Sequence, residues 1–227
     1  MRPSAPHYMP WSARVVAALA LLLVLALVVV ELDLVTAAYE RLGLHPRQAL
    51  ALLLASLAGS AINIPVARLP ETDWRSEQST RAFGIRYTIP ETPRWPGTIV
   101  ALNLGGAVVP MLLSAFLVAH VDHAARLFAV TAVVAVAAHR VARPVPGVGI
   151  AVPILVPPAA AALAAWLIAP EVRAAAAYVG GTMGTLIGAD LMNLRRLRGF
   201  GVPVASIGGA GTFDGIFVAG IVAVLLA

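Results

Sequence analysis

The feature that most constrains this chain is a succession of long apolar runs with few charged residues. A helix needs about 20 apolar residues to cross the hydrocarbon core of a bilayer. Only 12% of the residues are charged, about half the share found in soluble domains. The sequence therefore predicts a single all-α integral membrane domain over residues 1–227, a polytopic transmembrane helical bundle of about seven spans. We expect these spans near 13–35, 48–66, 97–119, 124–138, 149–168, 174–194 and 202–227.

Two alternatives concern the number of spans. Three prolines between positions 153 and 158 predict a kink or a late start in the fifth run, so a six-span arrangement stays open. The first run follows Arg2 and Arg14 and ends near Val35-Thr36-Ala37, a small-residue pattern that is typical of a signal-peptide cleavage site. Because the run is long for a signal peptide, we favour a retained helix.

The distribution of arginine predicts the orientation, since all sixteen basic residues are arginine. Positive charge concentrates on the cytoplasmic side of membrane proteins. A cytoplasmic N-terminus leaves four arginines on the opposite side, namely Arg41, Arg47, Arg126 and Arg173. The other twelve then lie on the cytoplasmic side: Arg2, Arg14, Arg68, Arg75, Arg81, Arg86, Arg94, Arg140, Arg143, Arg195, Arg196 and Arg198. We therefore expect a multi-pass protein of the inner (plasma) membrane with the lipid bilayer as its partner, and no nucleic-acid binding.

One substantial hydrophilic stretch, Arg68–Pro96, interrupts the apolar runs. It mixes arginines, carboxylates and prolines, so it predicts a cytoplasmic loop. The segment Ser76–Ala82 is long enough for a short interfacial helix.

The chemistry that stands out is a pair of aspartates, Asp190 and Asp214, in the last two predicted spans. An aspartate near the centre of a membrane helix costs about 2.5–3.5 kcal/mol on insertion scales, so such residues usually have a function. The alternatives are a structural polar pair and, for Asp190, an interfacial ion pair with Arg195 or Arg196. Straight helices would offset the two aspartates by about 9 Å in depth. A shared site therefore requires an unwound segment between Val202 and Gly211.

Glycine surrounds both aspartates. Gly180, Gly184 and Gly188 form a stripe that predicts close helix packing, within this chain or in an oligomer. Gly211 and Gly215 flank Asp214 and predict broken helix that lines a binding cavity, although close packing alone is an alternative reading.

Three asparagines are expected at the same depth as Asp190. Asn63 ends the second predicted span, Asn103 begins the third, and Asn193 ends the sixth. Each alone is more often an interhelical hydrogen bond than a ligand. Together they predict a polar binding cavity that opens to the cytoplasm.

Cofactor motifs are not evident. The chain contains no cysteine, which excludes thiolate chemistry and disulfides. The cluster His120-Val121-Asp122-His123 is more typical of a solvated turn than of a metal site. We therefore expect neither a metal ion nor a cofactor.

Five stretches resemble a bacterial and archaeal family of integral membrane proteins of unknown function. They are Gly59–Pro65, Asn103–Pro110, Pro146–Pro153, Tyr178–Asp190 and Ile207–Gly220. The resemblance implies no activity.

The spacing of the aspartates also resembles intramembrane aspartyl proteases of the presenilin and prepilin-peptidase kind. That resemblance implies a catalytic dyad of Asp190 and Asp214, in which one carboxylate activates water and the other holds a proton. The chain departs from the pattern of those proteases. Gly211-Thr212-Phe213-Asp214 replaces their Gly-x-Gly-Asp, Ala189 replaces a tyrosine, and no Pro-Ala-Leu motif is present.

Three functions compete at this point. The leading hypothesis is an intramembrane aspartyl protease that acts on a transmembrane substrate helix. The alternatives are a proton- or cation-coupled transporter or channel for a small solute, and a non-enzymatic membrane scaffold.

Overall fold

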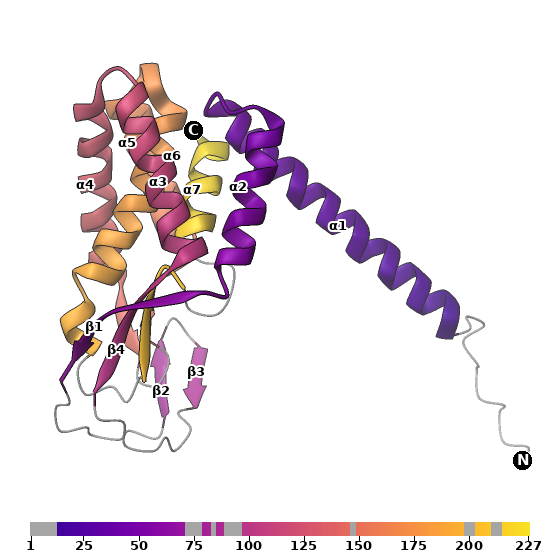
Figure 1. The fold of residues 1–227 in the computed structure, drawn as a ribbon, viewed down its shortest axis with the longest axis horizontal. Coiled ribbons are helices and arrows are strands. Elements are labelled where there is room, and N and C mark those ends of the chain that lie inside the picture. The colour runs from indigo at the N-terminus through magenta and orange to yellow at the C-terminus, as the bar shows by residue number, and fades with distance from the viewer. Residues whose placement is uncertain are drawn as a thin grey trace, which may run out of the picture.

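The computed structural model describes residues 13–70, 79–82, 85–88, 97–145, 149–197, 203–209 and 215–227. Within them the chain is mostly helical, with a small sheet at one end (Figure 1). The α-helices are α1 Ala13–Arg41, α2 Pro46–Gly59, α3 Val109–His120, α4 Ala124–Val141, α5 Val156–Ile168, α6 Arg173–Thr185 and α7 Gly215–Leu226. Two π-helices, η1 Leu104–Val108 and η3 Leu186–Leu191, adjoin α3 and α6. Two short 3-10 helices, η2 Pro170–Val172 and η4 Leu194–Leu197, complete the helical elements.

Helix α6 is the central helix of the bundle. Every residue from Ala175 to Thr185 except Met183 is buried. The glycine stripe contacts α4 of the same chain, because a Cβ on Gly180 or Gly184 would lie within 2.6 Å of Val130 or Val134. The opposite neighbour, α7, approaches α6 at Gly181 and Gly220. Small residues therefore let α4 and α7 pack closely against α6 on two of its sides.

The first helix is attached to the bundle only through its last turns. Ala38 and Tyr39 are buried, and the ring of Tyr39 lies 6.4 Å from that of Tyr178 on α6. Arg41 donates hydrogen bonds from Nη1 to the carbonyl oxygens of Val224 (3.1 Å) and Leu225 (3.2 Å) at the end of α7. The earlier part of α1 extends away from the other helices (Figure 1).

The strands gather at one end of the bundle. The main sheet has the order β1-β4-β7, with bounds Asn63–Leu69, Thr98–Asn103 and Val204–Ile207. Strand β4 lies at its centre, antiparallel to β1 and parallel to β7. Two hairpins, β2 Ser79–Ala82 with β3 Ile85–Thr88 and β5 Arg143–Val145 with β6 Gly149–Ala151, complete the strands of the described residues.

These strands correct the expectation of an all-α chain. Four apolar runs that we expected as membrane spans contain a strand at their sheet end, namely β1, β4, β6 and β7, and the late helix start expected for the fifth run is one of these places. The expected interfacial helix at Ser76–Ala82 is also wrong where the structure describes it, because Ser79–Ala82 is strand β2. Apolar composition does not separate a buried strand from a helix, and the runs 98–100 and 204–207 are rich in β-branched residues.

The outer surface of the bundle is apolar. On α5 the alanines at 161, 162, 164 and 165 face inward, whereas Leu163, Trp166 and Leu167 are 59–65% exposed. Helix α4 likewise exposes Phe128, Val133 and Val136. In a water-soluble protein the large apolar side chains face the core. Within the described residues one helix, α4, is long and apolar enough by itself to cross a membrane.

Candidate functional site

The sheet end of the bundle brings together polar side chains that are far apart in the sequence. Asn63 on β1 lies directly opposite Asn103 on β4 in the antiparallel register. Asn103 is 2% exposed and donates from Nδ2 to the carbonyl oxygen of Ser60 (2.8 Å) and to Oδ1 of Asn63 (3.1 Å). Its own Oδ1 accepts from the backbone amide of Gly106 (2.8 Å), so Asn103 caps η1.

Strand β7 joins this pair from the other edge of the sheet. Ser206 donates from Oγ to Oδ1 of Asn63 at 2.5 Å. The side chain of Asn63 therefore accepts hydrogen bonds from both Asn103 and Ser206. This triad connects all three strands of the main sheet through side chains.

Asp190 is hydrogen-bonded to Gly208, the residue that directly follows strand β7. The backbone amide of Gly208 donates to Oδ2 of Asp190 at 3.1 Å. Gly208 has φ +74, a conformation that L residues with a side chain rarely adopt, and a Cβ there would overlap Ala107 of η1. Gly209 lies against the side-chain amide of Asn103. The Gly208-Gly209 turn thus lies between Asp190 and the asparagine pair.

Asp190 is held by η3, the π-helix that continues α6. π-helical segments inside longer helices are rare and occur often at functional sites. Gly188, two residues earlier, lies against the backbone of Ala135 on α4, whereas the carboxylate of Asp190 contacts Gly208. The packing face and the carboxylate therefore occupy different sides of the same segment.

Asn193 follows Asp190 by three residues and makes a separate set of hydrogen bonds. It is fully buried and donates from Nδ2 to the carbonyl oxygens of Gly188 (2.8 Å) and Ala189 (3.0 Å), so it caps the end of η3. Its Oδ1 has no hydrogen-bond partner among the residues that the structure describes. No hydrogen bond joins Asn193 to Asn63 or Asn103 within the described residues.

Asp214 and Gly211 lie outside the described residues. Gly215 is the first residue of α7, and a Cβ there would meet nothing within 4 Å. On α7, Ala219 lies level with Gly181, and Gly220 lies level with the turn between Tyr178 and Thr182. Continued to the start of α7, this antiparallel register makes Gly215 level with Thr185, the last residue of α6 before η3.

Sequence reasoning missed Ser206 and Gly208, although both contact predicted site residues. Ser206 is a lone serine in a short apolar strand, which carries no local signal. Gly208 had one available signal, since a glycine pair directly after β-branched residues is typical of a turn.

Comparison with known proteins gives a family and no activity. Residues 57–226 match the model of a family described as "Protein of unknown function (DUF1614)". The match includes Asn63, Asn103, Asp190 and Asp214 and leaves out all of α1 and most of α2. No curated protein and no solved structure matches the chain.

Proposed function

Since the chain belongs to the DUF1614 family, whose activity is unknown, we propose a function from the geometry alone. We propose that it is a multi-pass membrane protein whose site lies at the sheet end of the bundle. There Asp190 and Asp214 act as an aspartyl dyad that hydrolyses a peptide bond of a transmembrane substrate helix.

The packing of the bundle supports the membrane part of this proposal. Small residues pack between the helices, and large apolar side chains cover the outside of α4 and α5. Membrane bundles have this distribution because lipid solvates large apolar side chains and small residues let helices approach. The turns α1–α2, α3–α4 and α5–α6 lie at the end away from the sheet (Figure 1). That end carries Arg41, Arg47, Arg126 and Arg173, as the seven-span orientation requires.

The hydrogen bond from Gly208 to Asp190 is the observation that carries the catalytic part. A dyad required an unwound segment before Asp214, and residues 204–208 form a strand and a turn instead of a helix. This segment lies against Asp190 and leads along the chain to Asp214. Helix α7 starts at Gly215, and its antiparallel packing on α6 at Gly181 and Gly220 is consistent with a start near the end of α6, where η3 with Asp190 begins.

The chemistry follows from two nearby carboxyl groups. Like charges at short range cannot both ionise cheaply, so such a pair shares one proton. The ionised carboxylate takes a proton from water, whose oxygen attacks the peptide carbonyl, and the protonated carboxyl donates a hydrogen bond to the developing oxyanion. The tetrahedral intermediate then collapses as its C–N bond breaks, and the carboxyl that took the proton from water delivers it to the departing amine. The Gly208 amide holds Asp190 in place by donating to Oδ2.

Cysteine cross-linking tests the geometry, because the natural chain contains no cysteine. We expect a short bifunctional thiol reagent to join the double variant Asp190→Cys/Asp214→Cys, because two carboxyl groups that share a proton can have Cβ atoms farther apart than the roughly 3.5–4.5 Å that a direct disulfide requires. Ile64→Cys/Leu102→Cys, a directly opposed pair on β1 and β4, is the positive control. Asp190→Cys/Glu171→Cys joins opposite ends of α6 and is the negative control. If the control pair at Ile64 and Leu102 cross-links and the pair at Asp190 and Asp214 does not, the dyad is contradicted.

Activity is tested with the full chain in liposomes that contain a tagged single-span reporter. Asp190→Asn and Asp214→Asn should each reduce cleavage by at least about a hundredfold, the typical contribution of a positioned acid or base. Asp122→Asn, in the exposed α3–α4 turn, is the matched control and should cleave normally. Loss of solute uptake in Asp190→Asn without any reporter cleavage would assign the site to transport. Full function of both variants would indicate a scaffold.

A further inference from the structure

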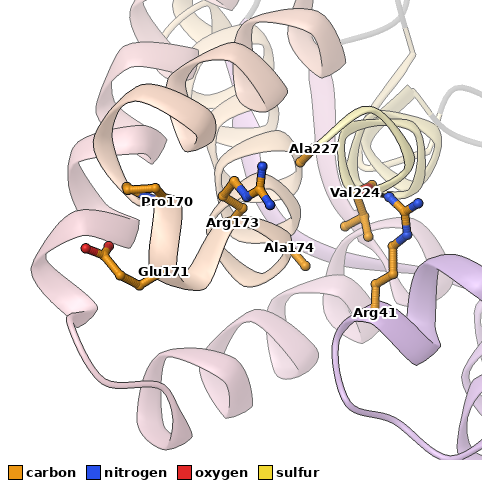
Figure 2. Close-up of a pocket in the computed structure, with 7 residues that line it drawn as sticks. All are labelled: Arg41, Pro170, Glu171, Arg173, Ala174, Val224 and Ala227. Carbon is orange, nitrogen blue, oxygen red and sulfur yellow. Dashed lines mark hydrogen bonds between the residues drawn. The ribbon is translucent and has the colours of Figure 1, made fainter.

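A second feature lies at the end of the bundle opposite the sheet. The end of α1, the turn between α5 and α6 and the end of α7 surround a pocket of about 420 Å³ (Figure 2). Arg41 and Arg173 line it from different elements, and Val224 and Ala227 form the wall between them. The proposed dyad does not use this pocket.

The pocket carries positive charge that the described residues do not neutralise. Glu171 lines the pocket, but its side chain points away from both guanidinium groups in Figure 2 and forms an ion pair with Arg126. Arg173 has no hydrogen bond or ion pair within the described residues. Arg41 donates from Nη1 to two carbonyl oxygens of α7, which leaves its Nη2 and Nε groups for another acceptor.

The backbone contributes charge of both signs, because the negative C-terminal end of α7, at Val224 and Ala227, also lines the pocket. Helix α6 begins at Arg173, directly after η2, and no side chain of the described residues caps its N-terminus. The N-terminus of a helix carries a partial positive charge that favours an anion. A guanidinium group from α1, a guanidinium group from α6 and the positive end of α6 therefore meet at one pocket.

From this geometry we infer that the pocket binds a phosphate group, with Arg173 as its main ligand and Arg41 as its second. Guanidinium groups match phosphate because their N–H groups fit two oxygens at once. A bilayer supplies such a group in its anionic lipid headgroups, at the depth where terminal arginines of membrane helices lie. Inorganic phosphate offers the same oxygens without the acyl chains.

The test measures binding to the full chain in a neutral detergent that contains no phosphate. Native mass spectrometry follows adducts of phosphatidylglycerol, and thermal unfolding follows the effect of inorganic phosphate. We expect Arg173→Ala to weaken the binding about tenfold, the loss expected for a charge-assisted hydrogen bond. Arg173→Lys should recover part of it. Arg47→Ala removes the same charge from the same end, outside the pocket, and should bind as the wild type does.

The two binding measurements distinguish a lipid headgroup from free inorganic phosphate as the source of the phosphate group. Retention of phosphatidylglycerol without an effect of inorganic phosphate assigns a lipid headgroup, and the reverse assigns a free anion. The inference is overturned if neither binds, or if Arg173→Ala and Arg47→Ala lose the same affinity. Because a carboxylate on Ala227 would itself lie in the pocket, the affinity tag is placed at each end of the chain in turn. The difference between Arg173→Ala and Arg47→Ala must persist with both tags.

Discussion

The two ends of the helical bundle provide hydrogen-bond and charge partners for their polar groups with different chemistry. At the sheet end, neutral amides and a hydroxyl join Asn63, Asn103 and Ser206 to each other and to the backbone. At the opposite end, Arg41 caps the carbonyl end of α7, and Arg126 pairs with Glu171. At the sheet end Asn103 is buried although Asn63 is exposed, whereas Arg126 and Glu171 have side chains 38% and 54% exposed.

This difference indicates which substitutions should lower the stability of the fold most. A buried donor or acceptor that loses its partner costs the full penalty of desolvation, whereas an exposed charge regains water. We therefore expect substitutions at the sheet end to destabilise the protein far more than substitutions at the arginine end. Each of the following predictions includes a result that would contradict this expectation.

The largest effect is expected for Gly188→Ala, close to Asp190. A Cβ at this position would overlap the carbonyl group of Ala135 on α4, and backbone cannot move aside as a flexible side chain can. Overpacking of this kind should lower the free energy of unfolding by about 3 kcal/mol. Thermal unfolding in detergent, followed by circular dichroism, measures it. Gly215→Ala is the control, since a Cβ there meets open space, and equal unfolding temperatures for both variants would contradict close α4–η3 packing.

The second prediction concerns Asn103→Ala. This change removes three hydrogen bonds and leaves the amide of Gly106 and the carbonyl of Ser60 without their partner. The free energy of unfolding should fall by about 2 kcal/mol. Asn103→Asp keeps the acceptor for Gly106 and loses the donor, so it should lie between Asn103→Ala and the wild type. If Asn103→Ala unfolds as the wild type does, the sheet end does not depend on this network.

The sequence was sufficient to predict that most of the chain is helical and that Asn63, Asn103 and Asp190 lie at the same end of the bundle. The run 124–138 corresponds to α4 almost residue for residue, since it lacks proline and glycine and has a helical apolar pattern. The unwound segment before the last helix was a condition of the dyad hypothesis and not a prediction from the sequence, although Pro203 and the glycines near 208 are poorly suited to a regular helix.

The contacts within the site could not be predicted in the same way. Asn63 and Asn103 were expected at similar depth, but their opposition depends on the register of strands forty residues apart. Register depends on long-range pairing, and a slip of one residue would place each side chain on the other face of the sheet. The link between Ser206 and Asn63 spans 143 residues and has no local signal at all.

A smaller effect is expected for Arg41→Ala at the opposite end. The variant loses two hydrogen bonds, one to the carbonyl group of the buried Val224 and one to the more exposed carbonyl group of Leu225. Water replaces the lost donors in part, so the free energy of unfolding should fall by about 1 kcal/mol. Arg41→Lys keeps a positive charge at the negative end of α7 and should recover about half of the loss. A loss for Arg41→Ala that exceeds that of Asn103→Ala would reverse the comparison of the two ends.

The smallest effect is expected for the ion pair of Arg126 and Glu171. Both side chains are partly exposed, so solvent and salt screen their attraction. A double-mutant cycle of Arg126→Ala and Glu171→Gln should give a coupling energy of at most about 0.5 kcal/mol, and raised ionic strength should reduce it further. Glu171→Gln should instead tighten phosphate binding if Glu171 lowers the positive potential of the pocket that it lines. A coupling energy above about 1 kcal/mol would mean that charge stabilises this end as strongly as a buried amide does, and the contrast between the two ends would fail.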